Sequence, residues 1–209
     1  MRLKPLINLF WGRPVECVLY FNQRCNSRCP MCAIWTANEK EELSLEQLKN
    51  IFAQLIKLGF LRVNFQGGEP LLRRDVLEAA RLARSCGLVP IIITNGIFLK
   101  PELAKALFDE GCSIIVSLDT LKPELYAKIR GVPQLPVVLE NIEEAARFAK
   151  PGQLAVNMTV HGLNAEETED IYNFAMSRNI GFSAYPYNYN IGVASAAKDE
   201  LIPDKYIVE

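Results

Sequence analysis

Short apolar runs alternate with amphipathic stretches along this chain, and this alternation constrains the fold more than any other sequence feature. Two runs, residues 91–93 and 114–116, are unbroken and β-branched, as is typical of strands buried on both faces of a sheet. Amphipathic segments between such runs indicate helices that connect parallel strands. The pattern therefore predicts an α/β fold with a parallel sheet and helices outside it.

The expected strands and helices can be located from their apolar pattern and from the residues that begin them. We expect strands at residues 15–21, 61–66, 89–94, 113–118, 153–160 and 181–185. A capping residue followed three positions later by Glu or Gln marks three helix starts: Ser44 with Gln47, Asp75 with Glu78, and Asn164 with Glu167. Pro101 begins another helix, and residues 123–129 and 137–149 are further helical segments.

Two architectures fit six strand–helix units, and periodicity does not separate them. One is a doubly wound sheet, and the other is an incomplete (β/α) barrel. In both, functional groups lie at the carboxyl ends of the strands. Polar or glycine-rich segments follow the first four predicted strands there: a cysteine-rich loop, then residues 67–70, then residues 94–96, then Ser117 with Asp119.

Length and charge narrow the classes of protein. The 209 residues suit one domain, and we expect a core at 15–186, an N-terminal extension at 1–14 and a tail at 187–209. Lys and Arg number 23 against 24 Asp and Glu, so no excess of positive charge indicates a nucleic-acid partner. No apolar run is long enough to span a membrane or to form a signal peptide. We therefore expect a cytoplasmic protein whose thiols stay reduced.

Three of the six cysteines, Cys25, Cys29 and Cys32, lie in one loop with the spacing C-x3-C-x2-C. A structural zinc site requires a fourth protein ligand, which no nearby residue supplies. A disulfide would leave one thiol unpaired and is disfavoured in the cytosol. Three thiolates instead suit a 4Fe–4S cluster with one iron open to another ligand. A zinc-stabilised structural domain remains the less favoured alternative.

With these cysteines, the chain resembles the radical S-adenosylmethionine (SAM) enzymes over about residues 15–186. The resemblance implies a partial (β/α)6 TIM-like barrel with parallel strands and the cluster loop after the first strand. It also implies that Cys25, Cys29 and Cys32 hold one 4Fe–4S cluster, whose open iron binds SAM. An electron from the cluster would then cleave SAM to a 5′-deoxyadenosyl radical, which abstracts hydrogen from a substrate.

The same resemblance implies residues that bind SAM. Gly67, Gly68 and Glu69 match a Gly-Gly-Glu segment that lines the methionine moiety, where Glu69 would accept a hydrogen bond from the ammonium group. Ser117 and Asp119 match a fourth-strand element that meets the ribose or the carboxylate of SAM. The remaining expected SAM-binding residues are Asn95 after the third strand, Arg130 near the SAM carboxylate, and Met31 where the family often has an aromatic residue.

The expected function is therefore radical SAM chemistry on an unidentified substrate, either a small molecule or a peptide. An electron donor such as flavodoxin or ferredoxin is the expected partner. The alternative is a non-catalytic iron–sulfur protein that transfers electrons or responds to redox state. His161 follows the fifth strand, where either a pocket position or a structural role is open.

Overall fold

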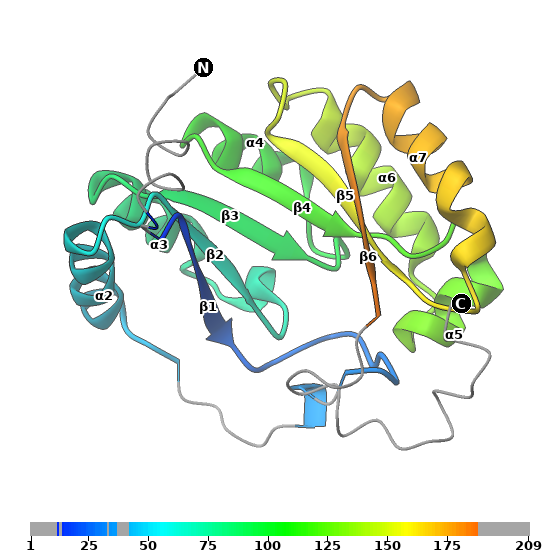
Figure 1. Ribbon diagram of the computed structural model, residues 1–209, viewed down its shortest axis with the longest axis horizontal. Helices are drawn as coiled ribbons and strands as arrows, with labels where there is room; N and C mark the ends of the chain where they lie inside the picture. The colour runs from blue at the N-terminus through cyan, green and yellow to red at the C-terminus, as the bar shows by residue number, and fades with distance from the viewer. Residues whose placement is uncertain (1–11, 13, 33, 37–41, 188–209) are drawn as a thin grey trace.

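The computed structural model describes residue 12 and residues 14–32, 34–36 and 42–187. Within them, six strands form one parallel sheet whose spatial order follows the chain. The strands are β1 (Glu16–Asn22), β2 (Arg62–Gly67), β3 (Val89–Thr94), β4 (Ser113–Ser117), β5 (Leu154–Val160) and β6 (Gly181–Pro186). Because β1 and β6 are the two edges of this curved sheet, the barrel is partial (Figure 1).

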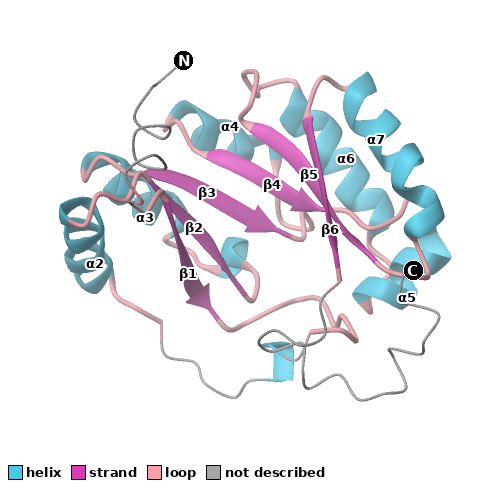
Figure 2. Cartoon of the chain, in the orientation of Figure 1, coloured by secondary structure: helices cyan, strands magenta, loops and turns pink. Residues whose placement is uncertain are grey.

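In the described part of the chain, six α-helices and three short 3₁₀ turns connect the strands. The helices are α2 (Leu45–Lys57), α3 (Val76–Ser85), α4 (Pro101–Asp109), α5 (Pro123–Arg130), α6 (Leu135–Ala146) and α7 (Thr168–Ser177). The 3₁₀ turns are η1 (Ile34–Thr36), η2 (Pro70–Leu72) and η3 (Ala165–Glu167). Figure 2 shows the longer helices wrapped around the outside of the sheet. No described helix combines the length and the apolar character that crossing a bilayer would require.

The predicted α/β fold is confirmed, and every predicted strand is present with its ends shifted by at most one residue. The predicted capping box at Ser44 is confirmed as well. The Ser44 amide donates to Gln47 Oε1 at 2.8 Å, and the Gln47 amide donates to Ser44 Oγ at 3.2 Å. The predicted extension and tail lie almost wholly outside the described residues, so the domain limits stay a prediction.

The predicted capping box at Asp75 is wrong, because its carboxylate is bound elsewhere. Arg73 donates to both oxygens of Asp75, at 2.8 and 2.7 Å, and the Asp75 side chain caps no amide of α3. The Arg73 guanidinium is buried and lies 4.2 Å from the ring of Phe21. Asp75 therefore neutralises a buried cation that links β1 to the start of α3.

The predicted cap at Asn164 is also wrong. Its side chain accepts a hydrogen bond from the His161 amide at 2.8 Å and donates to Asp119 O at 2.9 Å. Glu167 accepts hydrogen bonds from Thr120 Oγ1 and from the Leu121 amide at 3.3 Å. Both side chains thus join the β4 and β5 loops instead of capping a helix.

The hydrophobic core lies between the outer face of the sheet and the helices. Phe21 and Phe65, on the neighbouring strands β1 and β2, stack with ring centroids 4.5 Å apart, and Phe52 of α2 lies 6.0 Å from Phe65. Successive side chains of a strand point to opposite faces. The alternate residues, beginning with Tyr20 on β1 and Gln66 on β2, therefore face the inside of the partial barrel.

Candidate functional site

One end of the cysteine loop is fixed by the segment that follows β2. The Gly68 amide donates to Asn22 O at 2.8 Å, and the Glu69 amide donates to Arg24 O at 2.7 Å. A Cβ atom at Gly68 would lie 2.1 Å from Arg24 O, and one at Gly67 would lie 2.4 Å from Asn22 O. The two glycines are therefore required because the loop crosses directly over them.

The middle of the loop is fixed by the C-terminus of α5. The Arg28 amide donates to Arg130 O at 3.0 Å, and the Cys29 Sγ lies 3.6 Å from the same oxygen. Gly131 adopts a left-handed conformation (φ 70°), and a Cβ atom there would lie 2.3 Å from Arg28 O. The helix end therefore holds the central cysteine through close backbone packing.

The attached loop directs its cysteines into a cavity of about 390 Å³ at the carboxyl ends of the strands. All but one of the predicted site residues line this cavity: Cys25, Cys29, Met31, Cys32, Gly67, Gly68, Glu69, Asn95, Ser117 and Arg130. Asp119 is the exception. The structure thus brings residues from five separate segments to one space, although their roles toward cofactors stay predictions.

Burial disfavours the thiolate form of Cys25 and of Cys29. It raises the pKa of Cys25 to about 11, and it also raises the pKa of Cys29. A thiol binds metal as the thiolate, so metal binding here must release protons. Thiolate ligands suit iron–sulfur clusters, and the three thiols share one cavity wall. In the described ranges, no three His, Cys, Asp or Glu side chains converge to hold a single metal ion.

The Glu69 carboxylate is buried and joins the ends of β2 and β3. Glu69 Oε1 accepts hydrogen bonds from Thr94 Oγ1 at 2.6 Å and from the Leu71 amide at 3.0 Å, and Oε2 accepts from the Asn95 amide at 2.7 Å. Burial raises the pKa of Glu69, and these donors oppose that shift. Glu69 therefore has a structural role besides the SAM contact that the sequence predicts.

Asp119 and Arg130 form a buried ion pair, with 2.6 Å between the Asp119 Oδ2 and the Arg130 Nη2. Asp119 is fully buried, and its Oδ1 accepts a hydrogen bond from the Thr159 amide at 2.8 Å. Burial lowers the pKa of Arg130, but Asp119, Cys29 and Tyr126 together more than offset this and raise it. Asp119 thus acts on the cavity by orienting Arg130, which does line it.

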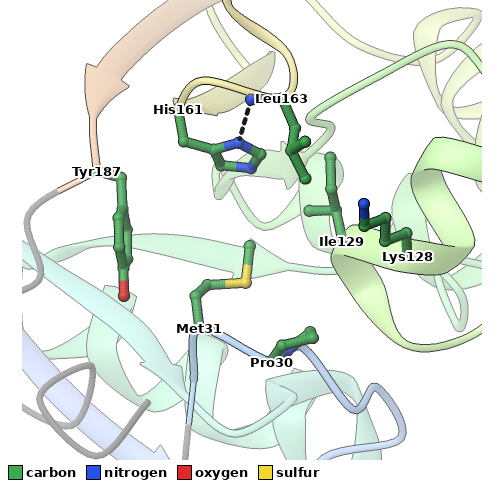
Figure 3. Close-up of a pocket in the computed structure, with 7 residues that line it drawn as sticks. All are labelled: Pro30, Met31, Lys128, Ile129, His161, Leu163 and Tyr187. Carbon is green, nitrogen blue, oxygen red and sulfur yellow. Dashed lines mark hydrogen bonds between the residues drawn. The ribbon is translucent and has the colours of Figure 1, made fainter. Parts of the chain in front are cut away.

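A smaller cavity of about 50 Å³ adjoins the loop on the side of Met31. Figure 3 shows Met31 and His161 reaching toward the same space, with Tyr187 along one side. The His161 Nδ1 accepts a hydrogen bond from the Leu163 amide at 3.3 Å, and burial lowers the pKa of His161. His161 therefore occupies a pocket position, while its fixed hydrogen bond also gives it a structural role.

Several cavity residues were not singled out from the sequence: Tyr20, Ser27, Ile34, Gln66, Ile93 and Thr159. On the strands, the alternation of side chains between the two faces of the sheet could have identified them. Tyr20, Gln66, Ile93 and Thr159 each stand near the carboxyl end of a strand, opposite in phase to the residues of the core. Ser27 lies in the loop and Ile34 in the short η1 turn. Neither segment has a sequence periodicity that predicts which way a side chain points.

The crossing of the loop over Gly68 predicts that Gly68→Ala destabilises the protein. A methyl group at 2.1 Å from Arg24 O must displace the loop. Gly152→Ala is the matched control, because its Cβ would meet nothing within 4 Å and only its positive φ of 82° carries a cost, about 1–2 kcal/mol. Urea unfolding should show a larger loss for Gly68→Ala, and equal losses would contradict the steric account.

The hydrogen bonds of Glu69 predict that Glu69→Gln lowers stability. Each carboxylate oxygen accepts from a backbone amide, so a side-chain NH2 would face another donor in either orientation. We expect a loss of about 1–3 kcal/mol in the free energy of unfolding. Glu140→Gln, at an exposed position, is the control and should be nearly neutral. Equal stability of the two variants in urea would show that Glu69 is protonated or unbound.

The sequence of this chain is similar to a known protein family and to several enzymes. A family model described as the radical SAM superfamily matches residues 19–175. A probable GTP 3′,8-cyclase of Thermococcus kodakarensis is 40% identical over 170 residues, which are 79% of this chain and 54% of the relative. A PqqA peptide cyclase of Rhizobium meliloti is 31% identical over 203 residues, which are 94% of this chain and 53% of the relative.

Structure comparison supports the same fold. The structure of Streptococcus suis SuiB bound to S-adenosylmethionine matches with a TM-score of 0.77 at 21% identity. The match covers 87% of this chain and 43% of SuiB. The chain thus spans about half the length of the curated relatives it matches, and less of SuiB.

Proposed function

We propose, on the premise that this chain belongs to the radical SAM superfamily, that it cleaves SAM reductively and abstracts hydrogen from a substrate. The family uses a 4Fe–4S cluster and SAM. The observation that supports this function most strongly is that Cys25, Cys29 and Cys32 line one cavity together with the Gly-Gly-Glu segment. When bound, the cluster would supply the electron that splits SAM into methionine and a 5′-deoxyadenosyl radical.

The chain's own residues hold and orient the reactants. The three thiolates would hold the cluster, and the two backbone attachments fix their loop against β2 and α5. The Asn95 amide group donates to Asn26 Oδ1 at 2.7 Å and to Ser27 Oγ at 3.1 Å, which adds a third attachment. Arg130, oriented by Asp119, offers a cation on the cavity wall that suits the SAM carboxylate.

The side chains on the inner face of the barrel indicate which class of substrate would fit. Its inward positions, taken from the period of two, are mostly amide, hydroxyl and aliphatic side chains: Val18, Tyr20, Asn64, Gln66, Ile91, Ile93, Ile115, Ser117, Asn157, Thr159, Ser183 and Tyr185. Among the described inward positions, only Glu16 and Arg62 are charged. These two residues lie at the amino ends of their strands, with 4.0 Å between Glu16 Oε2 and Arg62 Nη1.

This neutral face favours a peptide over a nucleotide as substrate. A nucleoside triphosphate carries several negative charges, and burying them requires paired cations. Among the described residues of the main cavity wall, Arg130 is the one cation, and Asp119 and the expected SAM carboxylate already occupy it. Amide and hydroxyl groups match the hydrogen bonds of a peptide. We therefore propose a peptide substrate, as the relative named PqqA peptide cyclase has, rather than the GTP of the relatives named GTP 3′,8-cyclase.

The cluster assignment predicts the metal content. Protein reconstituted anaerobically should contain about four iron and four sulfide per chain. Cys29→Ala should abolish this content, because it removes the central ligand, whereas Cys86→Ala, outside the loop, should retain it. Iron and sulfide assays with absorbance spectra provide the measurement. Stable binding of one zinc with no iron uptake would favour the zinc-stabilised domain instead.

A peptide substrate predicts that added peptides, but not added GTP, increase the cleavage of SAM. With dithionite and SAM, the complete cluster-loaded protein should release more 5′-deoxyadenosine when a pool of capped, uncharged pentapeptides is added. GTP should leave the release unchanged, because the inner face offers its phosphates no unpaired cation. Chromatography of 5′-deoxyadenosine measures both arms, with Cys29→Ala as the blank. Stimulation by GTP alone would reverse the substrate assignment.

A further inference from the structure

Arg130, the last residue of α5, lies against the central cysteine of the loop. Its carbonyl oxygen accepts a hydrogen bond from the Cys29 thiol, with 3.6 Å between the two heavy atoms. Its side chain is only 12% exposed and lines the main cavity together with Cys29. Figure 1 shows α5 beside the segment that follows β1 and carries the cysteines. The backbone of Arg130 is thus in contact with Cys29, and its side chain enters the same cavity.

The Arg130 side chain also acts on Cys29. Burial raises the pKa of Cys29, and Arg130 opposes this rise through its positive charge and through a hydrogen bond to the Cys29 side chain. The negative charge of Asp119 also reaches Cys29, but its effect is weaker than that of Arg130. The ion pair of Asp119 and Arg130 therefore presents its positive partner to this cysteine.

The ion pair leaves one buried nitrogen of Arg130 available as a donor. Nη2 lies 2.6 Å from Asp119 Oδ2, whereas the buried Nε donates to no acceptor among the described residues. A buried donor without an acceptor costs free energy, so its presence in a folded protein requires an explanation. The thiolate of a metal-bound Cys29 is a suitable acceptor. It has lost the proton that the thiol donates to Arg130 O, so it can only accept hydrogen bonds.

We propose that the Arg130 guanidinium donates a hydrogen bond to the Cys29 thiolate in the cluster-bound protein and thereby raises the reduction potential of the cluster. This inference rests on the proposed function, since it requires a cluster at the three cysteines. Arg130 is then a positioning residue for a cluster ligand, in addition to the SAM contact that the sequence predicts.

The direction of the effect follows from charge. On reduction the cluster gains one electron, and no bond forms or breaks. The sulfur ligands then carry more negative charge, so a hydrogen bond from a cation stabilises the reduced form more than the oxidised form. The carbonyl groups at the C-terminus of α5 act in the opposite direction, because they carry partial negative charge. The guanidinium offsets this cost of placing a cluster at a helix end.

A redox titration of the cluster-loaded protein without SAM tests the proposal. The double variant Asp119→Asn/Arg130→Met removes the donor and keeps the net charge of the pair at zero. At a fixed potential, the ratio of reduced to oxidised cluster should fall roughly tenfold, which is a shift of about 59 mV for one electron. Electron paramagnetic resonance of samples poised with dithionite measures this ratio. Because SAM is left out, its carboxylate cannot contribute to the difference.

A second buried ion pair provides the matched control. Arg73 Nη2 lies 2.7 Å from Asp75 Oδ2, and neither residue belongs to the described wall of the main cavity. Arg73→Met/Asp75→Asn should therefore leave the potential unchanged. An unchanged potential in Asp119→Asn/Arg130→Met, or an equal fall in both double variants, would overturn the proposal. A lack of iron and sulfide in the unaltered protein would overturn the proposed function instead.

A second measurement keeps the test open if the double variant does not fold. In protein labelled with ¹⁵N at the arginine guanidinium groups, electron spin echo spectra of the reduced cluster should show coupling to ¹⁵N without SAM. Arg130→Lys keeps the charge but should lose this coupling, whereas Arg28→Lys, at an exposed loop residue, should retain it. No coupling in the unaltered protein, or coupling that persists in Arg130→Lys, would overturn the proposal.

Discussion

The attachment of the cysteine loop by its backbone at two points is the constraint on which the site depends. At one point the Glu69 amide binds Arg24 O, and at the other the Arg28 amide binds Arg130 O. Each contact requires a neighbouring glycine, because a Cβ atom at Gly68 or Gly131 would collide with the backbone of the loop. The positions of the thiols are thus set by backbone geometry at the rim of the sheet, and the loop itself needs little regular structure.

The electrostatics of the cavity follow from burial. Glu69 and Asp119 are both buried carboxylates, and each is compensated, the first by three hydrogen-bond donors and the second by Arg130. A buried charge without such partners would cost several kcal/mol. The same groups that surround the thiols therefore also join β2 to β3 and β4 to α5. The residues expected to bind SAM also join these elements, so substitutions at them should change stability as well as chemistry.

The sequence predicted the α/β fold and named residues that, except for Asp119, line one cavity, but it did not predict the pairing of side chains. Strand positions followed from local apolar runs, and the Ser44 capping box followed from residues three positions apart. Asp75 and Asn164 carry the same local signal, yet Arg73 and the β5 loop bind their side chains instead. The partner of Asp119 is Arg130, which lies on another element. Contacts of this kind depend on tertiary packing, which no local pattern encodes.

The central claim is that the three cysteines hold a cluster whose open iron faces SAM. Electron paramagnetic resonance of the dithionite-reduced protein, recorded with and without SAM, tests this most directly. Binding of SAM to the open iron should change the signal of the reduced cluster, and the Cys29→Ala variant should show no such signal. A reduced-cluster signal that is identical with and without saturating SAM would contradict the account and would favour an iron–sulfur protein that only carries electrons.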